Sequence, residues 1–125
     1  MLRRGKPREI IWCMGMNDGD KTDAINDKWQ ADLEELIAIC ELNGITLVLA
    51  TIPNCPSINN TYKNEYVVQS GYRYIDFAGA VGSQSCSNWY TGMLEEGEGA
   101  CHPTEKGAMA LFSEAVATCP ELLRG

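Results

Sequence analysis

The chain has 125 residues, of which 45% are hydrophobic, and a formal net charge of −7. This length predicts a single domain, residues 1–125, with a modest core. An acidic chain repels phosphate backbones, so the charge argues against nucleic-acid binding. The apolar runs are too short for a membrane span. Residues 1–4 lead into charge and do not have the pattern of a signal peptide.

The first predicted element is a strand over residues 9–14, a short apolar run that ends at Gly15. Such a run is typical of a strand buried on both faces, as in a parallel sheet. A helix is expected over residues 23–42, and Gly44 supplies its stop because glycine adopts a left-handed conformation easily. Apolar side chains at helical spacing form one face of this helix. They are Trp29, Leu33, Leu36, Ile37 and Cys40.

The pattern then repeats, with a second buried strand over residues 45–50 and a weakly periodic helix over 57–70. Residues 72–77 alternate and predict a third strand. Residues 79–101 are rich in Gly, Ser and Glu and are expected to form a long loop, a kind of segment that often carries function. A last helix is expected to start at His102-Pro103-Thr104-Glu105, where the proline suits a first helical turn. Its predicted buried face comprises Ala108, Leu111, Phe112 and Ala115.

Alternating strands and helices predict an α/β protein with a parallel sheet and helices on both faces. Ligands bind such sheets beyond the carboxyl ends of the strands. This rule places residues 15–18, residues 51–53 and the loop before His102 on one rim. The two segments with the most chemical character are therefore expected to share one side of the molecule.

The first of these segments is Met14-Gly15-Met16-Asn17-Asp18-Gly19. Gly15 allows a tight turn directly after a strand, and the Asn17 amide can then point into the rim. Such a donor can stabilise the oxyanion of an acyl-transfer intermediate. A plain Asn-Asp-Gly turn without a chemical role is the alternative interpretation.

The second segment contains His102, the only histidine in the chain. A histidine between a loop and a helix can act as a general base because it titrates near neutrality. The alternative is an exposed residue at a helix N-terminus with no function.

Together, the two segments resemble blocks of the SGNH hydrolase superfamily, also called GDSL esterases and lipases. Its G-x-N-D block resembles residues 15–18, and its histidine-proline block before the last helix resembles residues 102–103. Intervening segments such as LATIPNCPSIN and SGYRYIDFAGAVG are similar to bacterial GDSL-like acylhydrolases. The resemblance implies a three-layer α/β/α flavodoxin-like fold, incomplete at its N-terminal strands. It also implies hydrolysis of acyl or acetyl esters, including esters on carbohydrate, without a metal or organic cofactor.

The chain departs from that family in two ways. The GDS block with the nucleophilic serine is absent, and no serine here follows an apolar strand in that setting. The family's acid, three residues before the histidine, is replaced by Gly99. Glu98 or Glu96 could orient His102 instead, although both could equally be solvated loop acids. A non-catalytic binding protein or an inactive fragment of the same fold therefore remains an alternative. A flavodoxin-like domain with an unrelated role is a third, but no Gly-rich phosphate loop supports it.

Two further expectations concern association and cysteines. Without the family's first strands, residues 9–14 form a sheet edge, which predicts a homodimer through that edge if the fold is not completed otherwise. The six cysteines contain no CxxC pair, so a zinc site is not expected. A Cys86–Cys101 disulfide is conceivable, but the sequence leaves the pairing open. The sequence does not decide whether the protein works in an oxidising or a reducing compartment, and an exported location is favoured over a cytoplasmic one.

Overall fold

A computed structural model describes residues 8–16 and 19–124. Strands and helices alternate along the first half of the chain, as the sequence predicts, and the second half is mostly loop and helix. In chain order the elements are β1 (Glu9–Trp12), α1 (Asp23–Asn43), β2 (Thr46–Ala50), α2 (Thr61–Gln69), β3 (Tyr74–Ile75), α3 (Phe77–Ala80), α4 (Glu105–Thr118) and the 3-10 helix η1 (Pro120–Arg124).

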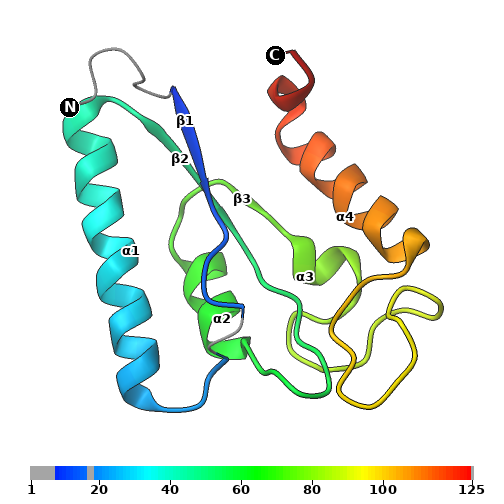
Figure 1. The fold of residues 1–125 in the computed structure, drawn as a ribbon. Coiled ribbons are helices and arrows are strands. Elements are labelled where there is room, and N and C mark those ends of the chain that lie inside the picture. The colour runs from blue at the N-terminus through cyan, green and yellow to red at the C-terminus, as the bar shows by residue number, and fades with distance from the viewer. Residues whose placement is uncertain (1–7, 17–18, 125) are drawn as a thin grey trace.

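The three strands form one parallel sheet in the order β1-β2-β3. Helices lie on both faces of this sheet, with α1 on one side and α4 on the other (Figure 1). Successive residues of β2 point to opposite layers. Leu47 and Leu49 pack in the core with Trp29 and Leu33 of α1. The predicted α/β/α architecture is therefore confirmed.

Helix α1 has the end signals that its sequence suggests. The hydroxyl of Thr22 accepts a hydrogen bond from the backbone N–H of Ile25 at 3.1 Å, which caps the helix N-terminus. Gly44 has φ 65° and closes the C-terminus. The predicted apolar face is also confirmed. Its residues are buried (Trp29, Leu33, Cys40) or packed against the buried cluster (Leu36, Ile37).

Several boundaries differ from the prediction. Strand β1 ends at Trp12 rather than at residue 14, and α4 begins at Glu105, after its N-cap Thr104. Helix α2 begins at Thr61 rather than at residue 57, because Cys55 and Ile58 exchange two backbone hydrogen bonds and hold that segment in a turn. The third strand has only two residues, Tyr74–Ile75. The chain leaves the sheet there because the Asp76 carboxylate accepts the Gly79 N–H at 3.0 Å and starts the short helix α3.

The prediction for the buried face of the last helix is partly wrong. Ala108 and Phe112 are exposed, with 55% of Phe112 accessible, whereas Ala115 packs against the cluster under β2 and β3. Helix α4 lies over β3 and α3, so no described element covers the rest of its apolar face. The face of the sheet that α4 covers is also incompletely covered over β1. Ile11 of β1, which pairs in register with Val48, is 37% exposed.

The outer side of β1 is an edge of the described sheet. The predicted edge is therefore present over Glu9–Trp12, and Ile11 of β1 and Met14, two residues after its end, are exposed. Among the described helices, none combines the length and the apolar character that crossing a membrane requires.

Candidate active site

The loops that follow β1 and β2 and the loop that precedes α4 carry the candidate residues. The long loop before α4 (yellow to orange) lies beside the segment that follows β2, at the lower right of Figure 1. Contacts between these segments show how the rim is built. Asn17 and Asp18, which the sequence predicts to be part of the site, lie outside the described residues.

The turn after β1 requires glycine at position 15. Gly15 has φ +106°, and a Cβ there would lie 2.9 Å from both Cε of Lys63 and Cδ1 of Trp29. The indole of Trp29 also donates a hydrogen bond to the Met14 carbonyl at 2.8 Å. The chain entering the G-x-N-D segment is therefore packed tightly against α1 and α2.

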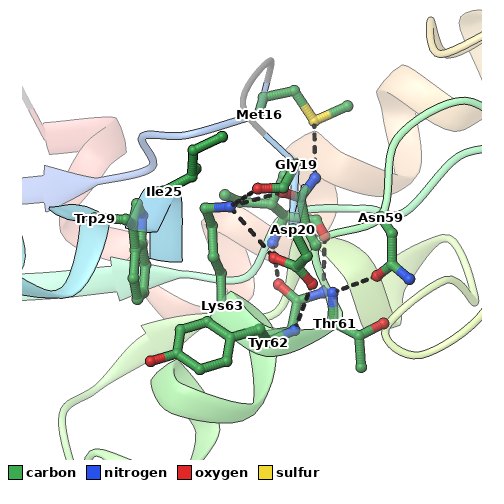
Figure 2. Close-up of polar contacts among 12 residues, drawn as sticks. Met16, Gly19, Asp20, Ile25, Trp29, Asn59, Thr61, Tyr62 and Lys63 are labelled. Carbon is green, nitrogen blue, oxygen red and sulfur yellow. Dashed lines mark hydrogen bonds and ion pairs between the residues drawn. The ribbon is translucent and has the colours of Figure 1, made fainter. Parts of the chain in front are cut away.

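The chain leaving this segment is bound by Lys63 of α2 (Figure 2). The Lys63 ammonium is fully buried and lies 2.5 Å from the Gly19 carbonyl oxygen and 3.4 Å from a carboxylate oxygen of Asp20. The other Asp20 oxygen accepts the Tyr62 backbone N–H at 2.8 Å. Sequence reasoning missed Lys63, because lysine is among the residues least often buried and nothing in its neighbourhood signals burial.

The backbone around His102 is fixed by a short antiparallel pairing. Leu94 and Pro103 form its bridge, and the His102 carbonyl accepts the Glu95 N–H at 3.0 Å. The hydroxyl of Thr104 then caps α4 by accepting the Gly107 N–H at 3.2 Å. The His102 side chain is exposed on this rigid backbone, which leaves its imidazole accessible to a reacting group.

The candidate acids lie in the exposed part of the same loop. Glu96 and Glu98 are exposed, as is Gly99. Within the described part of the chain, neither carboxylate forms a hydrogen bond or ion pair with His102. The orienting role of Glu98 or Glu96 therefore stays a prediction.

A disulfide between Cys55 and Cys101, 46 residues apart in sequence, joins the segment after β2 to the residue before His102. The conceivable Cys86–Cys101 pairing is not formed, and Cys86 is a free, exposed thiol. The carboxyl end of β2 carries Cys55 to this loop, a proximity that sequence order does not reveal. Next to the bridge, Ser57 Oγ lies 3.3 Å from Cys101 Sγ and donates to the Gly99 carbonyl at 3.3 Å.

The segment of residues 55–60 touches both candidate motifs. On one side, a Cβ at Gly19 would lie 3.3 Å from Ile58 Cγ2 and 3.3 Å from the Asn59 carbonyl oxygen. On the other side, Ser57 and the disulfide contact the loop that leads into His102. A pocket of about 370 Å³ follows the same segment. It is lined by Asn54, Cys55, Pro56, Ser57, Ile58, Asn59, Thr61, Ser85, Cys86 and Ser87.

Asp76, at the end of β3, is committed to structure. One of its carboxylate oxygens accepts hydrogen bonds from the Thr51 hydroxyl at 2.8 Å, the Gly79 N–H at 3.0 Å and the Gln84 amide at 3.1 Å. This carboxylate fixes the loops after β2 and β3 to each other. It therefore supports the rim and is not the acid that would orient His102.

No family model matches the chain, and no curated protein matches it. A search of solved structures finds a protein from Desulfitobacterium hafniense named for the G-D-S-L family of lipolytic proteins, with a TM-score of 0.70 and 21% sequence identity. The match covers 91% of this chain and 66% of that one. The chain therefore has a GDSL-type fold. It spans about two thirds of that structural neighbour, which agrees with a sheet that is incomplete relative to that fold.

Proposed function

We propose that this chain is part of a GDSL-type ester hydrolase in which His102 is the general base and Asn17 donates to the oxyanion. The substrates are acyl or acetyl esters, including esters on carbohydrate. The observation that carries the proposal is the shared neighbour of the two motifs: the turn flanking Asn17 and the loop leading into His102 both pack on residues 55–60. The GDSL-type fold of the chain supports it independently.

The proposed chemistry is acyl transfer. The His102 imidazole takes the proton from an attacking hydroxyl, and the ester carbonyl oxygen becomes negatively charged as the tetrahedral intermediate forms. The Asn17 amide donates to that oxygen, an interaction worth roughly 3–4 kcal/mol in comparable sites. Gly15 shapes the turn that carries Asn17, and Glu98 is the candidate for holding the imidazole in the required tautomer.

The nucleophile is the open part of this proposal, since the GDS serine block is absent from the sequence. Ser57 is a serine that the structure brings to the loop before His102, through its contacts with Cys101 and Gly99. A non-catalytic binding protein is the second candidate function. The observation that favours it is the exposed His102, which has no acid bonded to it in the described part of the chain.

Hydrolysis of p-nitrophenyl acetate separates the two functions. The proposal expects ester hydrolysis that His102→Ala abolishes and that Asn17→Ala lowers about 10²–10³-fold, while the exposed Gln69→Ala leaves the rate unchanged. Loss of activity in Ser57→Ala would identify the nucleophile within this chain. Hydrolysis that His102→Ala does not alter contradicts the proposal, and absence of hydrolysis favours the binding function.

A further inference from the structure

A free thiol and a disulfide lie beside the same pocket. Cys55 and Cys86 both line the pocket of about 370 Å³ that follows residues 55–60. Cys55 is joined to Cys101 by the disulfide, whereas Cys86 is a free, exposed thiol. Because a free thiol can exchange with a disulfide that it reaches, the distance that separates Cys86 from the bridge is the first point to establish.

The loop that carries Cys86 is bound to the residue next to Cys55. The side-chain amide of Asn54 donates to the Gln84 carbonyl at 3.0 Å. On the other side of Cys86, the indole of Trp89 donates to the Asn54 carbonyl at 2.6 Å. Both ends of this short loop are thus held at Asn54, which keeps Cys86 close to Cys55.

The Cys86 thiol is also free to move within its loop. Its sulfur contacts the carbonyl oxygens of Gly82 at 3.4 Å and of Asn88 at 3.6 Å. A thiol is a weak donor, so these contacts hold it loosely. Exposed side chains change rotamer within nanoseconds, and Cys86 can therefore turn toward the pocket without any change in the fold.

The serine beside the bridge suits the departure of Cys101. Ser57 Oγ lies 3.3 Å from Cys101 Sγ and 3.3 Å from the Gly99 carbonyl oxygen. The hydroxyl donates to that carbonyl in the disulfide state, but a thiolate at Cys101 would be the stronger acceptor because it is charged. Exchange is faster when the leaving thiolate is stabilised. The surroundings of the bridge therefore favour Cys101 as the leaving sulfur and Cys55, which lines the pocket, as the sulfur attacked.

We propose that Cys86 is the attacking thiol of an intramolecular exchange with the Cys55–Cys101 disulfide. The Cys86 thiolate attacks Cys55 Sγ, and a Cys55–Cys86 bond forms as the original bond breaks. The electron pair of the broken bond leaves on the Cys101 sulfur, which takes up from solvent the proton that Cys86 lost. One disulfide replaces another, so the step consumes no oxidant or reductant. The exchange detaches the loop before His102 from the segment after β2, and the proposal does not depend on ester hydrolysis.

Disulfide mapping of the parent chain tests the exchange. The protein is held without reductant at about pH 8.5, where thiolates form, then quenched in acid, alkylated with N-ethylmaleimide while unfolded, and digested for mass spectrometry. The Cys55–Cys86 peptide pair should appear in about 0.1–10% of molecules, as for a minor state, with an equal amount of alkylated Cys101. Cys13→Ser, at another exposed thiol, is the matched control and should leave this fraction unchanged.

Three results of the mapping would overturn the proposal. One is the absence of the Cys55–Cys86 pair, and another is a fraction that rises with protein concentration, which would mean exchange between molecules. The third is a Cys86–Cys101 pair with alkylated Cys55, because the attack would then be on the other sulfur.

Oxidation of Cys101→Ser tests separately whether the two sulfurs meet in the folded protein. Diamide takes two electrons from a pair of thiols, and in this variant it should close a Cys55–Cys86 bridge within one chain in most molecules. Adding Cys86→Ser should abolish the bridge and leave Cys55 open to alkylation. If Cys55 of Cys101→Ser stays reduced, or is oxidised only between chains, the sulfurs do not meet and the proposal is overturned.

Discussion

Gly107 of α4 lies so close to Met93 that a Cβ on it would be 2.1 Å from the Met93 carbonyl oxygen. That carbonyl accepts the Thr104 N–H at 2.9 Å. The first turn of α4 therefore packs directly against residues 93–95, which pair with residues 102–104. This contact fixes the helix relative to the loop that carries His102. The position of the candidate base therefore depends on the absence of a side chain at residue 107.

Gly107→Ala should destabilise the protein. Alanine is favoured over glycine within a helix by about 1 kcal/mol, but the clash with Met93 should outweigh this and produce a net loss of about 1–3 kcal/mol. Urea unfolding measures the change, with Ser113→Ala on the exposed side of α4 as the control, expected within about 0.5 kcal/mol of the parent. A Gly107→Ala variant more stable than the parent would show that the gain in helix propensity exceeds the cost of the clash. The contact between residue 107 and the Met93 carbonyl would then be loose.

Removing the Cys55–Cys101 disulfide should lower the free energy of unfolding. A bridge between residues 46 apart restricts the unfolded chain enough to contribute about 2–4 kcal/mol. The Cys55→Ser/Cys101→Ser variant should lose this amount in urea unfolding, and amides of the loop before His102 should exchange faster. Cys86→Ser, at a free and exposed thiol, should have no effect. Equal stability of the double variant and the parent would show that the Cys55–Cys101 bridge does not stabilise the fold.

Much of the fold follows from local patterns. The strand of residues 46–50 and the apolar face of α1 can be predicted because each buries a continuous apolar run or a face with helical period. The apolar run that begins at residue 9 also predicts a strand, but the expectation that this strand is buried on both faces is wrong, since Ile11 is exposed. The short helix α3 cannot be predicted from the sequence, since its four residues are too few to show a helical pattern of apolar side chains. What starts it is the cap formed by the Asp76 carboxylate. The exposure of Phe112 cannot be predicted from the sequence either. Its helical spacing predicts an apolar face, but what covers that face is decided by other elements.

The candidate site divides in the same way. Gly15 and His102 carry local signals, a glycine after a strand and a histidine before a helix. Lys63 and the Cys55–Cys101 pair carry none, because their partners are distant in sequence and are brought to them only by the parallel sheet. Sequence therefore gives the residues that would do chemistry, whereas the residues that hold them in place emerge only from the structure.

Stability should fall at alkaline pH through two tyrosines, Tyr66 of α2 and Tyr72 before β3, whose hydroxyls donate to carboxylates of α1. Burial and the neighbouring carboxylate of Glu34 raise the pKa of the Tyr66 phenol, and burial and Glu41 raise the pKa of the Tyr72 phenol. A raised pKa means that the folded protein keeps its protons where the unfolded chain has lost them, so stability declines as pH rises above about 10. Urea midpoints measured from neutral to alkaline pH should show this decline, and Tyr66→Phe/Tyr72→Phe should reduce it. An identical decline in the double variant would refute the assignment.

The exposed edge of β1 predicts self-association. Ile11 and Met14 present apolar surface beside unpaired strand groups, and such edges tend to pair. Sedimentation of this chain should show a homodimer whose population rises with concentration, and Ile11→Lys should shift it toward monomer. A soluble monomer at every concentration tested would exclude pairing through this edge.

The central claim, that the Asn17 turn and His102 converge on one pocket, can be measured directly because the chain has a single histidine. Asn17→Asp changes charge with little change in shape. A carboxylate close to the imidazole favours its protonated form, so the single histidine resonance in NMR should titrate at a higher pH in Asn17→Asp than in the parent chain. Gln69→Glu, at the end of α2 away from residues 55–60, should leave the pH at which this resonance titrates unchanged. A titration unchanged by Asn17→Asp would place the two side chains apart and contradict the hydrolase site.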